Sequence, residues 1–188
     1  DRIITESWLE EMLQLCQQKD VGMAGAKLYY PDDTIQHAGV VVGLGGVAAH
    51  VLCKLPRDAE GYMGRLRCVQ EISAVTAACM MVKTSVFKAV GGFDEELKVA
   101  FNDIDLCMKV RKYGVKIVFT PYAELYHYES KSRGMEDTPE KQLRFSREVN
   151  CFRRKWEREL LKGDPYYNPN LTLNNTDCSL RKQEKNGD

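Results

Sequence analysis

Hydrophobic residues recur along the chain at two different spacings, and each spacing predicts a different kind of element. In residues 8–16 and 139–162 the apolar side chains return every three or four positions, which is the period of a helix with one buried face. Residues 22–30 and 35–42 carry short apolar runs that end in turn residues, which is typical of strands. This alternation of helical and strand patterns predicts an α/β fold.

The middle of the chain continues the same alternation. Residues 72–82 are small and apolar, which predicts a strand buried on both faces and closely approached by other backbone. Residues 102–113 predict a helix that Asn102 caps, with acidic residues in its first turn and basic residues in its last, and 115–120 predict a further strand. Residues 43–68 mix Gly, Pro, Arg and Asp without a period, which predicts a long, partly ordered loop of a kind that is often functional.

Composition and charge indicate the size of the core and limit the classes of partner that the chain can bind. The chain has 188 residues, of which 44% are hydrophobic, enough for one sizeable core over residues 1–163. Residues 164–188 are polar and rich in Asn, which predicts an extended arm or tail. Because 27 basic residues cancel 27 acidic ones, no overall field draws the molecule onto a polyanion, and we expect no nucleic-acid partner.

The seven cysteines form no C-x-x-C pair, so neither a disulfide scaffold nor a zinc ribbon is expected. Several lie in apolar runs, where a free thiol acts as a small hydrophobe in a reducing compartment, and we therefore expect a cytoplasmic protein. The basic helix predicted over 139–162 leaves two interpretations open, a solvated outer face or peripheral contact with the inner face of the cell membrane.

Two carboxylates at the start of the predicted helix 102–113 are the first candidates for chemistry. Asp103 and Asp105 are separated by about 200° around a helix of 3.6 residues per turn, so they cannot face the same substrate. A carboxylate near a helix N-terminus is favoured in its ionised form, which a general base for a hydroxyl requires. Plain stabilisation of the helix end is the alternative interpretation.

A second candidate follows the strand predicted over 115–120. His127 is a potential metal ligand, and the hydroxyl and cationic residues from Ser130 to Arg133 suit a diphosphate. A hydrogen-bonded histidine and an exposed loop are the structural alternatives.

A third candidate is the G-x-G-x-x-A pattern from Gly43 to Ala48, which follows an apolar strand and raises the possibility of a dinucleotide-binding turn. Asp58 and Glu60 follow the pattern too soon for the usual spacing, and Pro56 interrupts the helix that such a turn needs. Both departures argue against a dinucleotide-binding turn.

Six segments, taken in order, resemble the second half of family 2 glycosyltransferases, particularly the rhamnosyltransferase-like bacterial enzymes that build surface polysaccharides. The resemblance extends over about residues 8–167, and together the segments are a strong signal although each alone is weak. The segments are Val21–Asp33, Ile35–Val40, Thr76–Val82, Val90–Glu95, Phe101–Cys107 and Pro121–His127.

This resemblance implies a GT-A sandwich, a mixed sheet with flanking helices. In that family a nucleotide-binding first half ends in an Asp-x-Asp motif that holds Mn²⁺ or Mg²⁺ on the donor diphosphate, and the second half binds the acceptor. The chain resembles the acceptor-side half only. Residues 3–9 look like the stretch that directly follows the Asp-x-Asp motif, which would place Asp1 just beyond it.

The resemblance also implies roles for single residues. Asp103 matches the aspartate that acts as general base in inverting transfer, and Asn102 stands where many members have Glu. Asp105 and Thr76 would be positional or acceptor-binding, as would Asn102. His127 matches a histidine that completes the metal site in several relatives. The diphosphate-binding loop would comprise Ser130, Lys131 and Arg133.

The expected activity is transfer of a sugar, with inversion, from a nucleotide sugar to a glycan or lipid-linked glycan acceptor. We expect the 188 residues alone to be inactive, and we expect a homodimer through a sheet edge because 72–82 would lie centrally with few strands beside it. Two other functions are kept as alternatives, a non-catalytic glycan-binding or assembly module and, last, a dinucleotide-binding oxidoreductase.

Overall fold

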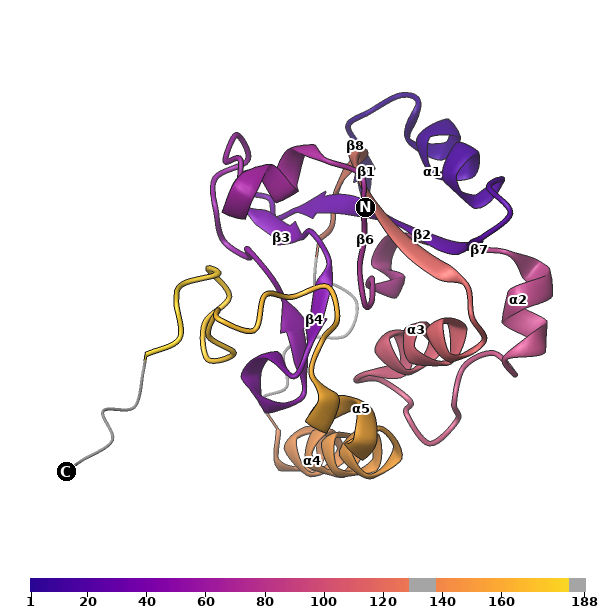
Figure 1. Cartoon of the computed structure of the whole chain (residues 1–188), viewed down its shortest axis with the longest axis vertical. Helices are drawn as coiled ribbons and strands as arrows, with labels where there is room; N and C mark the ends of the chain where they lie inside the picture. The colour runs from indigo at the N-terminus through magenta and orange to yellow at the C-terminus, as the bar shows by residue number, and fades with distance from the viewer. Residues whose placement is uncertain (129–137, 183–188) are drawn as a thin grey trace.

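The computed structural model describes residues 1–128 and 138–182, and it contains a curled mixed sheet with helices on both sides (Figure 1). The six-stranded sheet comprises β1 (Arg2–Ile3), β2 (Val21–Tyr29), β3 (Ile35–His37), β6 (Gln70–Glu71), β7 (Met80–Val82) and β8 (Lys116–Tyr126). A separate pair comprises β4 (Val40–Val42) and β5 (Ala48–His50). The helices are α1 (Trp8–Cys16), α2 (Thr84–Ala89), α3 (Asn102–Lys112), α4 (Pro139–Lys155) and α5 (Glu157–Lys162).

The centre of the sheet is the parallel pair of β2 and β8, with Ala24 opposite Val118. All nine residues of β2 are buried, because helices cover both of its faces. Successive strand residues point to opposite faces, so β2 supplies two cores at once. Ala24 packs with Met12 of α1, and Met23 packs with the core that includes α3 and α4.

The segment 72–82 is not the buried strand that its composition predicts. Residues 72–75 are buried but form no regular strand, Ala77–Cys79 form a 3-10 turn, and only β7 pairs with β2. β8 occupies the central position beside β2, so 72–79 instead crosses the sheet as an irregular strap. The expected close approach is present, since a Cβ on Gly25 would lie 2.3 Å from Cγ1 of Val75.

The loop predicted over 43–68 is more ordered than expected, and its first part rules out a dinucleotide-binding turn. β4 and β5 pair antiparallel, with Val42 opposite Ala48, and Gly43 N–H donates to the carbonyl of Val47 at 2.8 Å. The glycine-rich stretch is therefore the loop of a β-hairpin, whereas a dinucleotide fold requires a helix after the first strand. The oxidoreductase alternative loses its only support.

The single strand predicted over 35–42 is two strands, because the chain turns at Gly39, where φ is +104°. β3 stays with β2 in the large sheet, and β4 leaves to pair with β5. The strand predicted over 115–120 is longer than expected, since β8 continues through Pro121.

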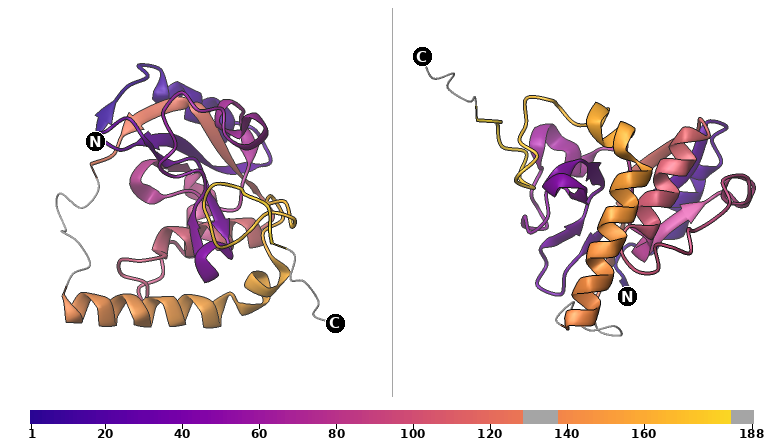
Figure 2. Two further views of the ribbon diagram at one scale, coloured as in Figure 1. Left: turned by 90° about the vertical axis from the view of Figure 1, so that its left-hand side faces the viewer. Right: turned by 90° about the horizontal axis from the view of Figure 1, so that it is seen from below.

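The predicted long helix is two helices joined at Trp156, whose backbone leaves helical geometry. Thr138 caps α4 by accepting a hydrogen bond from the N–H of Lys141 at 3.3 Å. Seen from below, α4 lies between α3 on one side and the β4–β5 hairpin on the other (Figure 2). Arg153 bridges to the hairpin by donating to the carbonyl of Gly46.

The polar segment that follows α5 is extended, yet it packs against the core in its described part, residues 164–182. Tyr167, Leu171 and Cys178 are buried in the core cluster that includes α3 and α4. Backbone hydrogen bonds attach the segment to the 43–52 region, for example from Leu52 N–H to the carbonyl of Thr176 at 2.6 Å. Its composition did not predict this burial. In the described residues no helix combines the length and apolarity that crossing a membrane requires.

Candidate functional site

The candidate site begins at the N-terminus of α3. Phe101 adopts a left-handed conformation with φ +63°, and its ring lies 5.3 Å from that of Phe152 in α4. This turn starts the helix at Asn102, which is therefore the first helical residue and not the cap that the sequence predicts. The Asn102 Oδ1 atom accepts a hydrogen bond from the N–H of Asp103 at 2.7 Å.

Asp103 is half-buried and receives backbone hydrogen bonds on both oxygens. Its Oδ2 accepts from the N–H of Ala77 at 3.0 Å, and its Oδ1 accepts from the N–H of Ile104 at 2.9 Å. Ala77 belongs to the strap across the sheet and follows Thr76, whose Oγ1 accepts from the N–H of Ala78. The fold thus brings Thr76 and Asp103 together from positions far apart in the chain.

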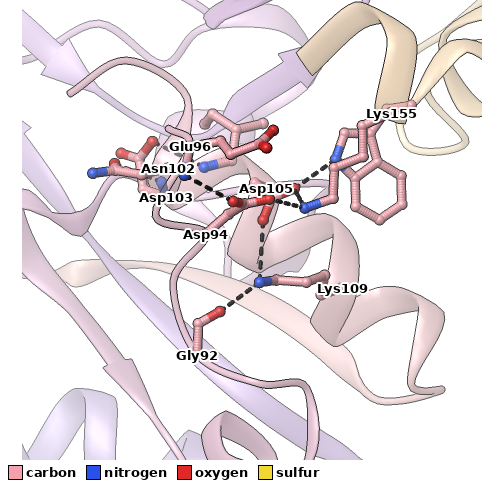
Figure 3. Close-up of polar contacts among 10 residues, drawn as sticks. Gly92, Asp94, Glu96, Asn102, Asp103, Asp105, Lys109 and Lys155 are labelled. Carbon is pink, nitrogen blue, oxygen red and sulfur yellow. Dashed lines mark hydrogen bonds and ion pairs between the residues drawn. The ribbon is translucent and has the colours of Figure 1, made fainter. Parts of the chain in front are cut away.

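Asp105 has the opposite environment, although it lies in the same helical turn. It is fully buried, and its Oδ1 accepts from Trp156 Nε1 at 2.8 Å and lies 2.7 Å from Lys155 Nζ. Its Oδ2 makes no hydrogen bond of good geometry but lies 3.2 Å from Lys109 Nζ. Figure 3 shows the two lysines directed at Asp105, with Asp103 turned to the other side of α3. The i, i+2 spacing predicted this divergence.

The lysines extend this network to a second carboxylate. Lys155 also reaches Asp94 Oδ2 at 2.5 Å, and Lys109 donates to the carbonyl of Gly92 at 2.5 Å (Figure 3). The hydrogen bond from Lys155 lowers the pKa of Asp94 below its ordinary value. Burial opposes the charge of Lys155, but Asp105 and Asp94 outweigh it, so the pKa of Lys155 is raised. Both shifts favour the ionised forms of Asp94 and Lys155.

His127 lies at the end of β8 and contacts a residue that sequence reasoning missed. Its Nδ1 atom is 2.7 Å from Oδ1 of Asp1, and β1 pairs with β8 to bring the two residues together. A carboxylate and an imidazole are both common metal ligands, so the pair fits part of a divalent-cation site. In the described residues no third His, Cys, Asp or Glu completes such a group. Ser130, Lys131 and Arg133 lie outside the described residues.

A groove of about 660 Å³ lies at the opposite end of α3 from Asp103. Arg111, Lys112, Trp156 and Tyr166 are among the residues that line it, and none of the described candidate site residues does. We locate the candidate site by its carboxylates and not by this groove.

Comparison with known proteins gives the family. The model of the family described as glycosyltransferase like family 2 matches residues 1–148. A Sinorhizobium fredii protein called uncharacterized protein y4gI is 57% identical over 95% of this chain, and the O-antigen biosynthesis protein RfbC of Myxococcus xanthus is 38% identical over 99% of it.

A shorter match of 36% identity covers 33% of the chain, to the N-acetylglucosaminyl-diphospho-decaprenol L-rhamnosyltransferase of Mycobacterium tuberculosis. The chain spans only 20%, 14% and 20% of the lengths of these three relatives, in the same order. The mixed α/β fold is the one expected for a GT-A-like domain. The chain belongs to the glycosyltransferase-like family 2.

Proposed function

We propose that this chain forms the acceptor side of an inverting glycosyltransferase with Asp103 as general base. The observation that carries the proposal is the contrast within the first turn of α3. Two lysines neutralise the buried Asp105, whereas in the described residues the hydrogen bonds to the half-buried Asp103 come from backbone N–H groups. A carboxylate held in place yet accessible can accept a proton from a substrate hydroxyl.

In the proposed reaction an acceptor hydroxyl binds beside Asp103 and transfers its proton to the carboxylate. The hydroxyl oxygen forms a bond to the anomeric carbon of a nucleotide sugar, and the bond from that carbon to the diphosphate oxygen breaks on the opposite face. The backbone N–H of Ala77 holds Asp103 in position for this transfer. Thr76 and Asn102 are assigned to acceptor binding or positioning. The fully buried Asp105 can contribute to positioning only.

The diphosphate leaves as an anion, and neutralising that charge lowers the barrier. Asp1 and His127 would hold part of the coordination of Mn²⁺ or Mg²⁺, which when bound supplies positive charge at the diphosphate. Lys131 and Arg133, with Ser130, are proposed to contact the same diphosphate. We also propose that the 188 residues alone do not turn over a nucleotide sugar.

The proposed partners are a nucleotide sugar and a glycan or lipid-linked glycan. The names of the relatives support this choice, since one acts in O-antigen biosynthesis and one is named for a diphospho-decaprenol acceptor. We propose a cytoplasmic location because all seven cysteines are free. Association with the membrane face and dimerisation remain proposals, and the irregular path of 72–79 removes the original reason for a sheet-edge dimer.

A transfer assay tests the proposal. A longer natural protein that contains this chain would be incubated with nucleotide sugars, lipid-linked acceptors and Mn²⁺ or Mg²⁺, and the anomeric configuration of the product determined by NMR. We expect an inverted product, and chelation of the metal should abolish transfer. Glycan binding without any transfer would favour the alternative of a non-catalytic glycan-binding or assembly module. A product with retained configuration would contradict the assigned role of Asp103.

A further inference from the structure

A buried pair of histidines lies behind the backbone that holds Asp103. His37, in β3, is completely buried, and its Nδ1 atom lies 2.9 Å from Nδ1 of His50, which is half-buried in β5. The two rings are nearly perpendicular, at 83°, with centroids 4.9 Å apart. The contact joins the large sheet to the β4–β5 pair. The function proposed above uses neither residue.

The other ring nitrogen of His37 faces the strap. The N–H of Thr76 points to His37 Nε2 at 3.5 Å, that of Ala77 to Asp103 Oδ2 at 3.0 Å, and that of Ala78 to Thr76 Oγ1 at 3.3 Å. Three consecutive backbone donors therefore have defined acceptors. The N–H of Ala77 therefore binds the candidate base Asp103, and the preceding N–H, of Thr76, binds the buried His37.

These contacts determine where the protons of the neutral histidine pair lie. A backbone N–H can only donate, so Nε2 of His37 must accept from Thr76 and carries no proton. The proton of His37 is then on Nδ1, which donates to Nδ1 of His50, and His50 keeps its own proton on Nε2. The two rings are thus in opposite tautomers.

We propose that His37 and His50 are a positioning pair for Asp103. The pair fixes the Thr76–Ala77 backbone, so that the N–H of Ala77 holds the Asp103 carboxylate in its reactive orientation. This inference rests on the proposed role of Asp103. The chain of contacts runs from His50 to His37, from His37 to the Thr76 N–H, and from the next N–H to the carboxylate. Neither histidine touches the reacting atoms.

An additional proton on either histidine breaks this series of hydrogen bonds. On His37 it must occupy Nε2, opposite the N–H of Thr76. On His50 it occupies Nδ1, which then donates to His37 and forces the His37 proton onto Nε2, with the same result. Both histidines must therefore be neutral for the N–H of Thr76 to keep its acceptor.

Groups on the neighbouring elements affect the protonation of His37. Burial holds the pKa of His37 well below its ordinary value of 6.5, and His50 of β5 lowers it further. Asp103 and Cys107 lie on α3 beyond the strap, where Cys107 Sγ contacts the N–H of Val75 at 3.4 Å. Because the unfolded chain protonates His37 more readily, the stability contributed by neutral His37 is present above pH 6.5 and declines below it.

Two substitutions of His37 separate positioning from packing. His37→Gln places an uncharged acceptor near the site of Nε2, whereas His37→Asn is too short to reach Thr76 and retains only a polar group near Nδ1. We expect H37N to lower kcat about three- to tenfold with little change in the donor KM. H37Q should keep most of the activity, and it should retain a larger fraction of its neutral-pH rate at pH 5 than the unsubstituted protein does. Equal kcat in H37N and the unsubstituted protein would overturn the proposal.

A measurement without turnover keeps the inference separate from the proposed function. The chain has three histidines, so single substitutions assign their ring ¹⁵N resonances, and His127 serves as an internal reference. We expect a Nδ1–H tautomer for His37 and a Nε2–H tautomer for His50, with faster amide exchange at Ala77 in H37N than in H37Q. A Nε2–H tautomer for His37 would overturn the proposal even in an active enzyme. Absence of transfer with the expected tautomers would count against the proposed function alone.

If H37N does not fold, His50→Asn replaces it. Its side-chain oxygen lies near the site of Nδ1 and can accept from His37 without titrating, so the His37 tautomer and the Ala77 exchange rate should be preserved. His50→Leu removes that acceptor and should change both. Equal behaviour of H50N and H50L would show that the contact between the histidines does not control the strap.

Discussion

Asp103 and Asp105 occupy one turn of α3, and their surroundings differ in almost every physical respect. Asp105 is fully buried among two lysines and an indole N–H, whereas Asp103 is half-buried and receives backbone N–H groups. Lys155 and Trp156 come from the junction of α4 and α5, so Asp105 joins α3 to that junction. The spacing separated the two carboxylates, and the neighbouring elements gave them different surroundings.

The difference shows how a buried ion network can support an accessible carboxylate. A buried charge is tolerated only when it is paired and hydrogen-bonded, and Asp105 has partners from two directions. The network joins the first turn of α3 to the end of α4, and Asp103 projects from that turn on the other side (Figure 3). We therefore expect Asp103 variants to change rate and Asp105 variants to change stability.

The largest expected effect is on the rate of transfer in Asp103→Asn. Removing a general base typically costs 10² to 10⁴ in rate, or about 3 to 5 kcal/mol of barrier. Asn has one acceptor oxygen and can keep only one of the two backbone hydrogen bonds that Asp103 accepts, so we expect stability to fall by about 1 kcal/mol. Steady-state kinetics of a longer protein that carries this chain would give kcat, and titration would give donor affinity, which should be nearly unchanged.

Asp105→Asn is the matched control for that rate measurement. If Asp105→Asn loses the activity and Asp103→Asn keeps it, the two roles are reversed. If both variants keep it, the carboxylates are structural.

The next largest effect is on the stability of Asp105→Ala. The substitution leaves Lys155 and Lys109 without their buried counter-charge and Trp156 Nε1 without its acceptor. Removing one partner of a buried pair costs about 3 to 5 kcal/mol, and we expect the lower end because the Lys155 side chain is 33% exposed. Urea unfolding measures the loss. Asp103→Ala should lose much less, and equal losses would remove the distinction between the two carboxylates.

Gly25→Ala should disturb the strap that reaches Asp103. The new Cβ would lie 2.3 Å from Cγ1 of Val75, and overpacking of this kind typically costs about 1 to 3 kcal/mol. A double-mutant cycle with Val75→Ala separates the clash from other effects. Val75→Ala should cost much less in the Gly25→Ala background than alone, and additive losses would show that the strap does not press on β2.

The smallest expected effect concerns the outer carboxylate of the network, in Asp94→Asn. The pair with Lys155 is partly exposed, so its contribution is below about 1 kcal/mol. Because the pKa of Asp94 is lowered in the folded state, this contribution is present above the unfolded value of about 3.9 and is lost as pH falls below it. At pH 7 the melting temperature of Asp94→Asn should be slightly lower than that of the unsubstituted protein. At pH 2 to 3 this difference in melting temperature should shrink. A difference that grows in acid would contradict this assignment.

Local patterns in the sequence determined much of the fold. The apolar run of β2, the acidic and basic ends of α3 and the cap of α4 at Thr138 are all short-range features, and the structure places these elements where the patterns predict them. The divergence of Asp103 and Asp105 followed from helical geometry alone. The order of segments also sufficed to indicate the family, which the family model confirms.

Only the tertiary structure decided the features that depend on distant residues. The apolar segment 72–82 has the composition of a strand, but the parallel pairing of β2 with β8 takes the central position and leaves 72–79 as a strap. Asp1 and His127 meet across 126 positions because β1 pairs with β8. The partners of Asp105 in α4, and the burial of Tyr167, likewise arise from packing between elements. A local period reports which face of an element is buried, and it carries no information about which distant side chain covers that face.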